Sequence, residues 1–316
     1  MAPYLGRNSA IGFGEESTWG TAVSRTAWRP LASSSLLRSA TFVPRPDLKS
    51  DTTSAMRRGH YQASEEMGGS FEIAATYDNI GMLLKHSMGS VASSGSGPYT
   101  YTYTLAAAPP TGLTIETVRG TSTKSEVFEG CKISSLNMSV NAGECMMISC
   151  DIVGETASAR GTAGTPSYSG NENLVEHHHA GQLSFNSVSY DLTSFTLTVN
   201  NAVDRRQLLG STLTKEPLRS DFMSVELSFD LEAVDTLYTA LLAGTQGDAT
   251  ITFTHPTVSN RSMAFTIHNF YINTCTDSIS AAGIVSASVS GVAESDGTDE
   301  GLQIVVVNDN NDPVGN

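Results

Sequence analysis

The sequence predicts an all-β fold with minor α structure, arranged as two tandem antiparallel β-sandwich domains, each with one flanking helix and long loops. Thr, Val, Ile and Tyr recur in short patterns between Gly-rich breaks, which favours strands over helices. The 316 residues are twice the length of a common domain, and 39% of them are hydrophobic, enough for a substantial core. One order of strand, helix and hairpin also occurs twice along the chain.

The first repeated element is a strand followed by a short helix. Ser70–Ile73 matches Ser224–Leu227, with apolar and polar residues in the same phase. A helical apolar pattern follows each strand and has the same end signals, Asp at the N-cap and Gly after the last turn. These capping pairs are Asp78 with Gly89, and Asp235 with Gly244.

A hairpin follows each helix and supports the duplication. Residues 132–152 align with 271–291, and Ile133 pairs with Ile272 and Val140 with Ile279, both at an offset of 139. The helix caps have a larger offset, so the first copy contains a net insertion. We place this insertion in the Gly-, Ser- and Pro-rich stretch 89–112.

The stretch 155–172 is rich in Gly, Ser, Thr and Ala and is typical of a linker. We therefore assign residues 1–160 to the first copy, 161–172 to the linker, and 173–316 to the second copy with an acidic C-terminal tail. Two segments, 43–69 and 200–223, are expected to be long loops. Loops of this length are usually functional or disordered.

The net charge of −14 argues against binding to nucleic acid through phosphates, which requires Lys and Arg. The charge is uneven. Residues 1–165 carry 13 Lys and Arg against 14 Asp and Glu, whereas residues 166–316 carry 5 against 18. The second half is either an ordinary solvated acidic surface or a surface that lets DNA pass without binding it.

Strand 224–232 has the clearest two-faced pattern. Its apolar residues alternate with a polar face that carries Glu226, Asp230 and Glu232. Carboxylates on one strand face repel one another, so this face is a poor candidate for a buried contact. This face is either a water-facing sheet surface or the wall of a lumen. Glu72 is the equivalent of Glu226 in the aligned repeat, so it is the fourth candidate for a residue of such a wall.

Motifs for catalysis or cofactor binding are absent from the sequence, which contains no nucleophile elbow, Walker loop, HExxH or GxGxxG pattern. The triplet His177–His179 has no Cys or carboxylate at metal-ligand spacing, and the Asn/Asp-rich segment 307–313 lacks partner ligands for calcium. The four cysteines follow no metal-binding pattern, which favours small buried thiols. We therefore expect no enzyme activity, no cofactor, no metal site and no membrane segment.

Two segments resemble the tail tube proteins of long-tailed bacteriophages. Ile11–Thr21 (IGFGEESTWGT) is similar to the Gly-Phe and Glu-x-Thr-aromatic-Gly-Thr opening of that family, and Phe195–Asn201 (FTLTVNN) to its strand ending in Asn-Asn. The resemblance implies a structural virion protein, assembled in the host cytoplasm, that forms rings of six tube domains. With two domains per chain, three chains would form one ring.

The resemblance also implies partners. The rings would stack into a hollow tail tube that conducts DNA without binding it specifically, and the tube would meet the tail terminator, tape measure and distal tail proteins. A long loop would join successive rings. The candidate stacking residues are Arg45, Arg57, Arg58, Arg205 and Arg206.

An alternative hypothesis is a surface adhesin or decoration β-protein of a phage or bacterium. The segment Tyr99–Tyr103 (YTYTY) supports it, because exposed tyrosines are common at recognition surfaces. The two hypotheses differ in what the protein forms in solution, hollow tubes or discrete oligomers.

Overall fold

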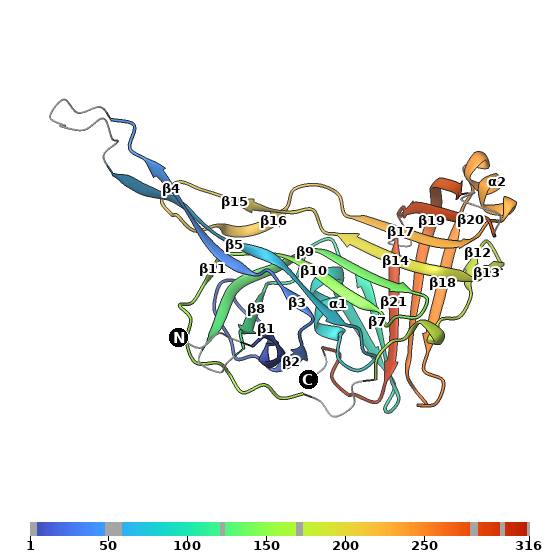
Figure 1. Cartoon of the computed structure of the whole chain (residues 1–316), viewed down its shortest axis with the longest axis horizontal. Coiled ribbons are helices and arrows are strands. Elements are labelled where there is room, and N and C mark those ends of the chain that lie inside the picture. Colours follow the sequence, from blue (N-terminus) through green and yellow to red (C-terminus); the bar gives the residue numbers. More distant parts are fainter. Residues whose placement is uncertain are drawn as a thin grey trace.

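The computed structural model describes residues 5–47, 59–120, 124–168, 173–278, 284–297 and 301–314. It confirms an all-β fold with minor α structure (Figure 1). The α-helices are α1 (Gly81–Met88) and α2 (Asp235–Ala243), and short 3-10 turns lie at Gly6–Asn8 and His177–His179. The strands are β1 (Ala10–Glu15), β2 (Ala27–Pro30), β3 (Ser33–Ser34), β4 (Leu37–Pro44), β5 (His60–Ala74), β6 (Gly89–Ser94), β7 (Tyr99–Leu105), β8 (Leu113–Val118), β9 (Ser125–Asn141), β10 (Met147–Gly154), β11 (Thr156–Ala157), β12 (Leu183–Phe185), β13 (Val188–Tyr190), β14 (Leu192–Asn200), β15 (Val203–Arg206), β16 (Lys215–Arg219), β17 (Ser224–Glu232), β18 (Gln246–Thr254), β19 (Ser262–Ser278), β20 (Ser286–Ala293) and β21 (Leu302–Asn308).

A long antiparallel sheet runs through both halves of the chain. Its strands follow the order β4-β5-β10-β9-β14-β17-β20-β19, with each neighbour hydrogen-bonded to the next. The first four strands come from the first half of the sequence and the last four from the second half. We call this eight-stranded layer the central sheet.

The two halves of the central sheet have the same internal order. β5 pairs with β10 and β10 with β9, just as β17 pairs with β20 and β20 with β19. A bulge interrupts each hairpin at the same place, at Ser134 in β9 and at Asn273 in β19. The register therefore confirms the alignment of the two hairpins at an offset of 139.

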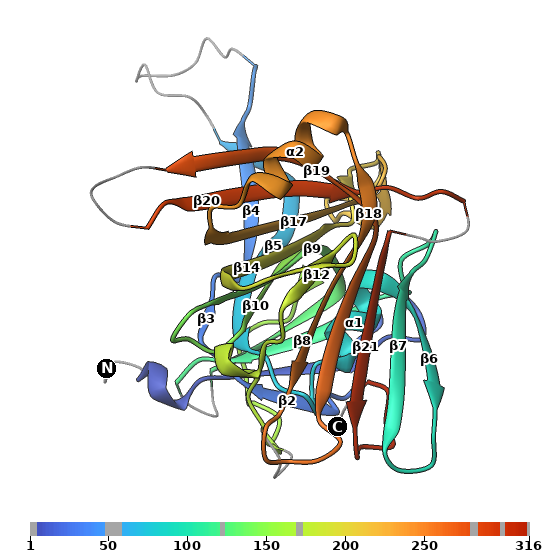
Figure 2. The same ribbon diagram turned by 90° about the vertical axis from the view of Figure 1, so that its right-hand side faces the viewer.

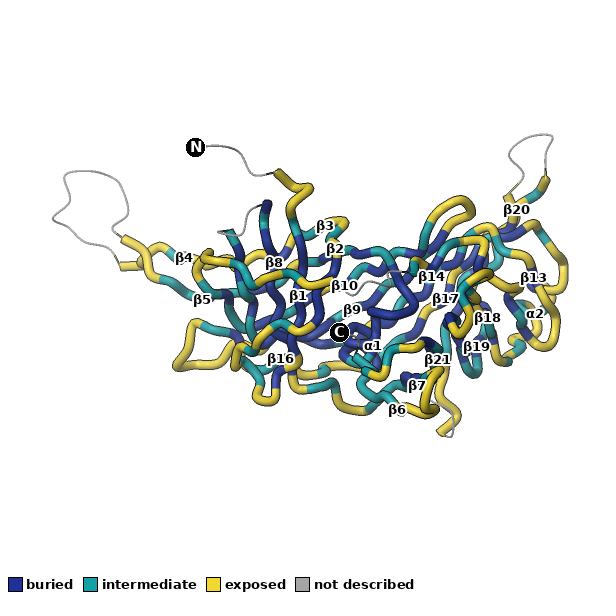
Figure 3. The backbone as a smooth tube through the Cα atoms, turned by 90° about the horizontal axis from the view of Figure 1, so that it is seen from below, coloured by how far each residue is buried: buried dark blue, intermediate teal, exposed yellow. Residues whose placement is uncertain are grey.

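Outer sheets pack beneath the central sheet, and the long strands β9 and β19 belong to both layers. The first part of β9 pairs with β8, which pairs with β1, whereas its last part enters the central sheet. β19 does the same, pairing first with β18 and β21 and then with β20. Apolar residues of the two layers form one continuous core between them (Figure 3).

The predicted insertion contains the hairpin β6–β7, and this hairpin joins the other half of the molecule. β7 pairs with β21 over Tyr99–Thr104, so the outer sheet of the second half continues as β18-β19-β21-β7-β6 (Figure 2). The side chains of Tyr101 and Tyr103 are 1% exposed. The expectation of an exposed tyrosine surface is therefore wrong, because both rings belong to the hydrophobic core.

The C-terminal segment also crosses to the first half. The hydroxyls of Tyr101 and Tyr103 donate to the carbonyls of Asn310 and Pro313, both at 2.6 Å. The amide N–H of Met82 in α1 donates to the carbonyl of Val314 at 3.0 Å. The segment that the sequence suggested as a polar tail is thus packed against the start of α1.

Both predicted helices are present, but the expected Asp caps are wrong. The N-cap positions are Ile80 and Val234, and neither makes a side-chain capping bond. The predicted ends are confirmed, since Gly89 and Gly244 follow the helices with φ of 101° and 59°. This left-handed conformation is accessible to glycine without a steric penalty.

Asp78 serves a different purpose, because it forms a buried ion pair between the halves. Its Oδ1 lies 2.9 Å from Nε of Arg261 at the start of β19, and both side chains are about 95% buried. The amide of Asn173 donates to Asp78 at 3.1 Å, and Nη1 of Arg261 contacts Asp309 at 2.9 Å. One carboxylate therefore ties together three segments that are distant in sequence.

We expect Asp78→Ala to lower the free energy of unfolding by about 3–5 kcal/mol, because it leaves the buried charge of Arg261 with only one carboxylate partner, the exposed Asp309. Urea denaturation monitored by circular dichroism measures this loss. Arg45→Ala is the control, since it removes an exposed pair with Asp47 and should cost at most about 1 kcal/mol. Equal losses in the two variants would contradict the assigned role of Asp78.

Candidate functional site

One face of the central sheet is mostly polar, with Ala74, Met147 and Val292 as apolar exceptions near its margin. In β17, Val225, Leu227, Phe229 and Leu231 are buried, and the alternate residues are not. The sequence predicted this alternation for β17, and it also holds in β10, β14, β20 and the adjoining parts of β5 and β9. It does not hold in β4, which has no buried residue. The polar face consists of Ser70, Glu72, Ser135, Asn137, Ser139, Asn141, Ser149, Asp151, Ser194, Thr196, Thr198, Glu226, Ser228, Asp230, Glu232, Thr274, Thr276, Ser286, Ser288 and Ser290.

Glu72 and Glu226 lie in one row across this face. Glu72 pairs with Ser149, Ser149 with Asn137, Asn137 with Thr198, and Thr198 with Glu226. Residues directly opposite each other in an antiparallel sheet point to the same side. The four carboxylates suggested by the sequence, which also include Asp230 and Glu232, therefore share one face.

The register corrects the repeat equivalence of Glu72. Glu72 faces Ser149 of β10, and Asp230 faces Ser288 of β20, which is the equivalent of Ser149 at the offset of 139. Glu72 is therefore the counterpart of Asp230, and not of Glu226. The predicted alignment of Ser70–Ile73 with Ser224–Leu227 is wrong by four residues, a shift that keeps each side chain on the same face.

Asp151 is a fifth carboxylate on the polar face that the sequence reasoning missed. It lies in β10, and the Ser135 hydroxyl donates to its Oδ2 at 2.6 Å. Asp230 is held in the same way by Ser194, at 2.7 Å. Strict alternation along β10, with Ile148, Cys150 and Ile152 buried, was the signal that could have identified it.

Positive charge is sparse in the central sheet, where the strands carry only Arg38 in β4 and Lys132 in β9. Among the described residues, none of the four predicted carboxylates forms an ion pair, and Arg205 pairs instead with Glu66 at 2.8 Å. The strand segments that contribute the residues of the polar face contain neither Lys nor Arg. These segments are 70–74, 135–141, 147–151, 194–200, 224–232, 274–278 and 286–290. The polar face thus combines small hydroxyl and amide groups with net negative charge.

The central sheet has two open edges. Within the described residues β4 is paired only with β5, and Ile272–Ser278 of β19 only with β20. An edge strand presents unpaired N–H and C=O groups that can pair with another chain. By contrast, the junction between the halves is closed, because β9 pairs with β14 over the whole segment Ser135–Asn141.

A long arm extends from the open edge at β4. β4 and the first part of β5 project from the body as a two-stranded ribbon, whose β4 side chains are mostly exposed, and the ribbon ends at residues outside the described part (Figures 1 and 3). The hairpin β15–β16 lies beside its base. The Arg205 guanidinium donates to the carbonyl of Met67 at 2.8 Å, and Lys132 contacts Glu216 at 2.7 Å.

The five arginines suggested for ring stacking fall into three groups. Arg205 and Arg206 are engaged within the chain, with Glu66 and with the carbonyl of Glu216. Arg45 is exposed on the arm, and its guanidinium forms an ion pair with Asp47 at 3.0 Å. Arg57 and Arg58 lie outside the described residues.

A histidine cluster lies where the two halves meet, next to Tyr77 of the first half. The structure brings together Glu176, His178 and His179, with ligand atoms within 4.8 Å of one another, so a carboxylate does stand near the triplet, contrary to the sequence expectation. Nδ1 of His179 accepts from the amide of Glu176 at 3.2 Å and lies 3.0 Å from the hydroxyl of Tyr77. The ring of His255 lies tilted against that of His179, with centroids 4.8 Å apart, and its Nδ1 accepts two backbone N–H groups.

These bonds give His179 a role in joining the segments that meet here. Burial lowers the pKa of His179, and the neighbouring His178 and His255 lower it further. Burial also raises the pKa of Tyr77 well above its usual value, so the phenol stays protonated as a donor. The cluster is a hydrogen-bonded contact between Tyr77 of the first half and the turn that carries His179.

In the described part of the chain, no helix has the length and apolar character needed to cross a bilayer. The four cysteines are free thiols, and burial raises the pKa values of Cys131 and Cys150 far above the usual range. Unionised buried thiols are poor nucleophiles and act as small apolar side chains.

The architecture is that of an assembly subunit, because its conspicuous surfaces are two open strand edges, a projecting arm and a polar sheet face. The model of the phage tail tube protein family matches residues 6–293, so the chain belongs to this family. It is a structural protein of the virion tail. No curated protein matches the sequence significantly.

The pH dependence of the free energy of unfolding should reveal the lowered pKa of the buried His179. Its folded pKa lies below the unfolded value of about 6.5, so acidification protonates the unfolded chain first and stability falls as the pH drops below that value. His179→Asn, which keeps an acceptor near Nδ1, should reduce this slope between pH 6.5 and 5 by up to about 1.4 kcal/mol per pH unit. His60→Asn on the exposed arm is the matched control. A slope in His179→Asn equal to that of the wild type would contradict the assignment.

Proposed function

We propose that three copies of the chain close head to tail into a ring, and that the rings stack into the hollow tube through which phage DNA passes. The observation that carries this proposal is the junction between β9 and β14. It shows how one four-stranded half-sheet joins the next within a chain. The open edges at β19 and β4 are the counterparts of β9 and β14, so the same junction can form between chains.

The repeat equivalence also gives a register for the junction between chains. Within the chain Ser135 faces Asn200, and Asn137 faces Thr198, with a hydrogen bond of 2.9 Å between the last two side chains. At the repeat offset of 139, the positions in β19 equivalent to Ser135 and Asn137 are Thr274 and Thr276. Because Glu72 is the counterpart of Asp230, Glu66 and Gly68 of β5 are the counterparts of Ser224 and Glu226 of β17. Glu66 and Gly68 pair with Ser39 and Leu37 of β4, as Ser224 and Glu226 pair with Asn200 and Thr198 of β14. We therefore propose that Thr274 faces Ser39 and Thr276 faces Leu37 of the next chain.

Each chain supplies two tube domains in this proposal, one on each side of the β9–β14 junction. The boundaries 1–160 and 173–316 describe the chain path of the two domains. In space, the hairpin β6–β7 and the segment after β21 cross between them. These exchanges make the two domains of one chain inseparable, which suits a ring of three chains with pseudo-sixfold symmetry better than a ring of six with one domain decorating the outside.

The ring stoichiometry can be measured directly. We expect native mass spectrometry of rings released from tubes to show three chains, because two domains per chain fill six positions. Rings of six chains would refute the proposal. The same preparation viewed by negative-stain microscopy should contain hollow tubes, whereas discrete, non-tubular oligomers would favour the adhesin alternative, which has lost its support from exposed tyrosines.

The polar face of the central sheet is proposed as the wall of the lumen. The opposite face of the sheet is buried in the core, so the polar face is the one available to line a bore. DNA carries one negative charge per about 1.7 Å of duplex, and a wall with Lys or Arg would bind its phosphates. Carboxylates and hydroxyl groups keep a hydrated wall that repels the backbone. The repulsion acts within about 8 Å at physiological salt, close to the wall.

The arm is proposed as the contact between successive rings, with Arg45, Arg57 and Arg58 as candidate contact residues. A two-stranded ribbon has no core of its own and gains stability by packing on another surface. Arg205 and Arg206 would act indirectly, by holding the base of the arm. At its ends the tube would meet the tail terminator, tape measure and distal tail proteins, and assembly would take place in the host cytoplasm.

Charge reversal on the polar face tests the lumen assignment. The triple variant Glu226→Lys, Asp230→Lys and Glu232→Lys should still form tubes, but phage carrying it should eject DNA severalfold more slowly because the wall then binds phosphates. The rate can be followed by the release of a DNA-bound dye. A control with the same charge change at exposed positions outside the polar face is Asp191→Lys, Asp221→Lys and Glu294→Lys. Ejection at equal rates in both variants would count against the lumen assignment.

A further inference from the structure

The helix α2 exposes an apolar stripe. Val234, Tyr238 and Leu242 are spaced by four residues, so they lie along one side of the helix, and they are 38%, 48% and 71% exposed. Ile284 is 77% exposed and lies near the helix start, because the carbonyl of Val285 accepts from the N–H of Ala233. Only Leu237 of the helix is buried. An exposed apolar patch of this kind marks a contact surface.

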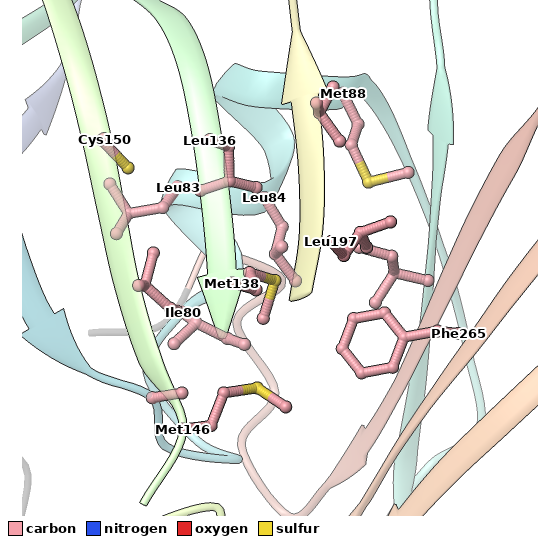
Figure 4. Close-up of a cluster of buried hydrophobic side chains, with 14 of the residues drawn as sticks. Ile80, Leu83, Leu84, Met88, Leu136, Met138, Met146, Cys150, Leu197 and Phe265 are labelled. Atoms are coloured by element: carbon pink, nitrogen blue, oxygen red, sulfur yellow. The ribbon is translucent and has the colours of Figure 1, made fainter. Parts of the chain in front are cut away.

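The corresponding helix of the first half is covered completely. α1 follows β5 as α2 follows β17, and every residue of α1 except Lys85 is buried. Figure 4 shows Leu84 and Met88 of α1 among Leu136 of the first half and Leu197 and Phe265 of the second half. The cover of α1 therefore comes in large part from the half of the molecule that follows it across the β9–β14 junction.

α2 stands at the open end of the same arrangement. It packs on β19, the strand whose edge is unpaired, as α1 packs on β9 (Figure 2). Among the described residues, no half-sheet lies against the exposed side of α2 in the way that the second half lies against α1. We propose that a second copy of this chain supplies this cover, and that the first half of that copy buries the stripe of Val234, Tyr238, Leu242 and Ile284. This inference rests on the proposed ring and names a contact that closes it.

The charge distribution favours this head-to-tail contact over a symmetric contact between two α2 helices. α2 belongs to the half with 5 basic and 18 acidic residues, whereas the first half carries 13 and 14. Two acidic halves placed face to face would repel each other, but the head-to-tail contact sets an acidic half against a nearly neutral one. A symmetric contact would also close a dimer and leave the edge at β4 unpaired.

A charge placed in the stripe tests the proposal. Leu242→Glu should leave the monomer folded, because the side chain is mostly exposed, but should reduce the polymerised fraction at least tenfold by burying a carboxylate in the contact. Thr239→Glu is the matched control, with the same charge added to an exposed residue of the same helix. Circular dichroism checks the fold, and sedimentation velocity measures assembly. Polymerisation of Leu242→Glu equal to that of Thr239→Glu would overturn the proposal.

Hydrogen exchange of the wild type gives a second measurement that needs no variant. Amides of residues 235–243 should exchange rapidly in the monomer and become protected in tubes formed from this chain alone. Tubes in which these amides remain unprotected, or protection that appears only when other tail proteins are added, would overturn the α2 contact and leave the ring intact. A wild-type chain that does not polymerise at all would overturn the ring and the α2 contact together.

Discussion

Main-chain pairing between β9 and β14 is the interaction on which the rest of the structure depends. It joins two half-sheets into one central sheet, and it places the second half where it can cover α1. Side-chain contacts reinforce it, including the bond from Asn137 to Thr198 and the buried Asn201, whose amide donates to the carbonyl of Ile133. An edge strand left open exposes a row of unpaired backbone groups, so each half requires a neighbour. The β9–β14 junction satisfies this requirement within the chain. The outer edges of the central sheet, at β4 and at Ile272–Ser278 of β19, have no further strand partner among the described residues.

The alternation of side chains gives the sheet its two functions at once. The apolar face, with residues such as Phe229 and Leu197, builds the core that holds the layers together. The polar face carries short hydroxyl and amide side chains that bond across strands and hold Asp151 and Asp230 in fixed positions. Because one strand contributes to both faces, stability and surface charge are set by neighbouring residues that can be changed separately.

Local patterns in the sequence predicted the parts of the fold that depend on local chemistry. Alternation in strand 224–232 identified the buried and polar residues correctly, and the glycines at 89 and 244 ended the two helices as expected. The offset of 139 aligned two hairpins whose bulges coincide. The match of Ser70 to Ser224 failed because a slip of four residues preserves alternation, so only the pairing to a neighbouring strand fixes the register. Contacts between segments distant in sequence could not be predicted for the same reason. Nothing within residues 89–112 indicates that β7 pairs with β21, and nothing near Asp78 indicates that its carboxylate binds Arg261 and does not cap the helix.

The most direct test of this account is a cryo-electron microscopy reconstruction of tubes formed by the wild-type chain, at a resolution that separates strands. The account predicts one continuous antiparallel barrel around the bore, in which β19 of each chain pairs with β4 of the next, with Thr274 opposite Ser39. The junction between chains should superpose on the β9–β14 junction within a chain, and the row from Glu72 to Glu226 should face the bore. A map in which the edge of β19 faces solvent, or in which the polar face lies on the outside of the tube, would contradict it.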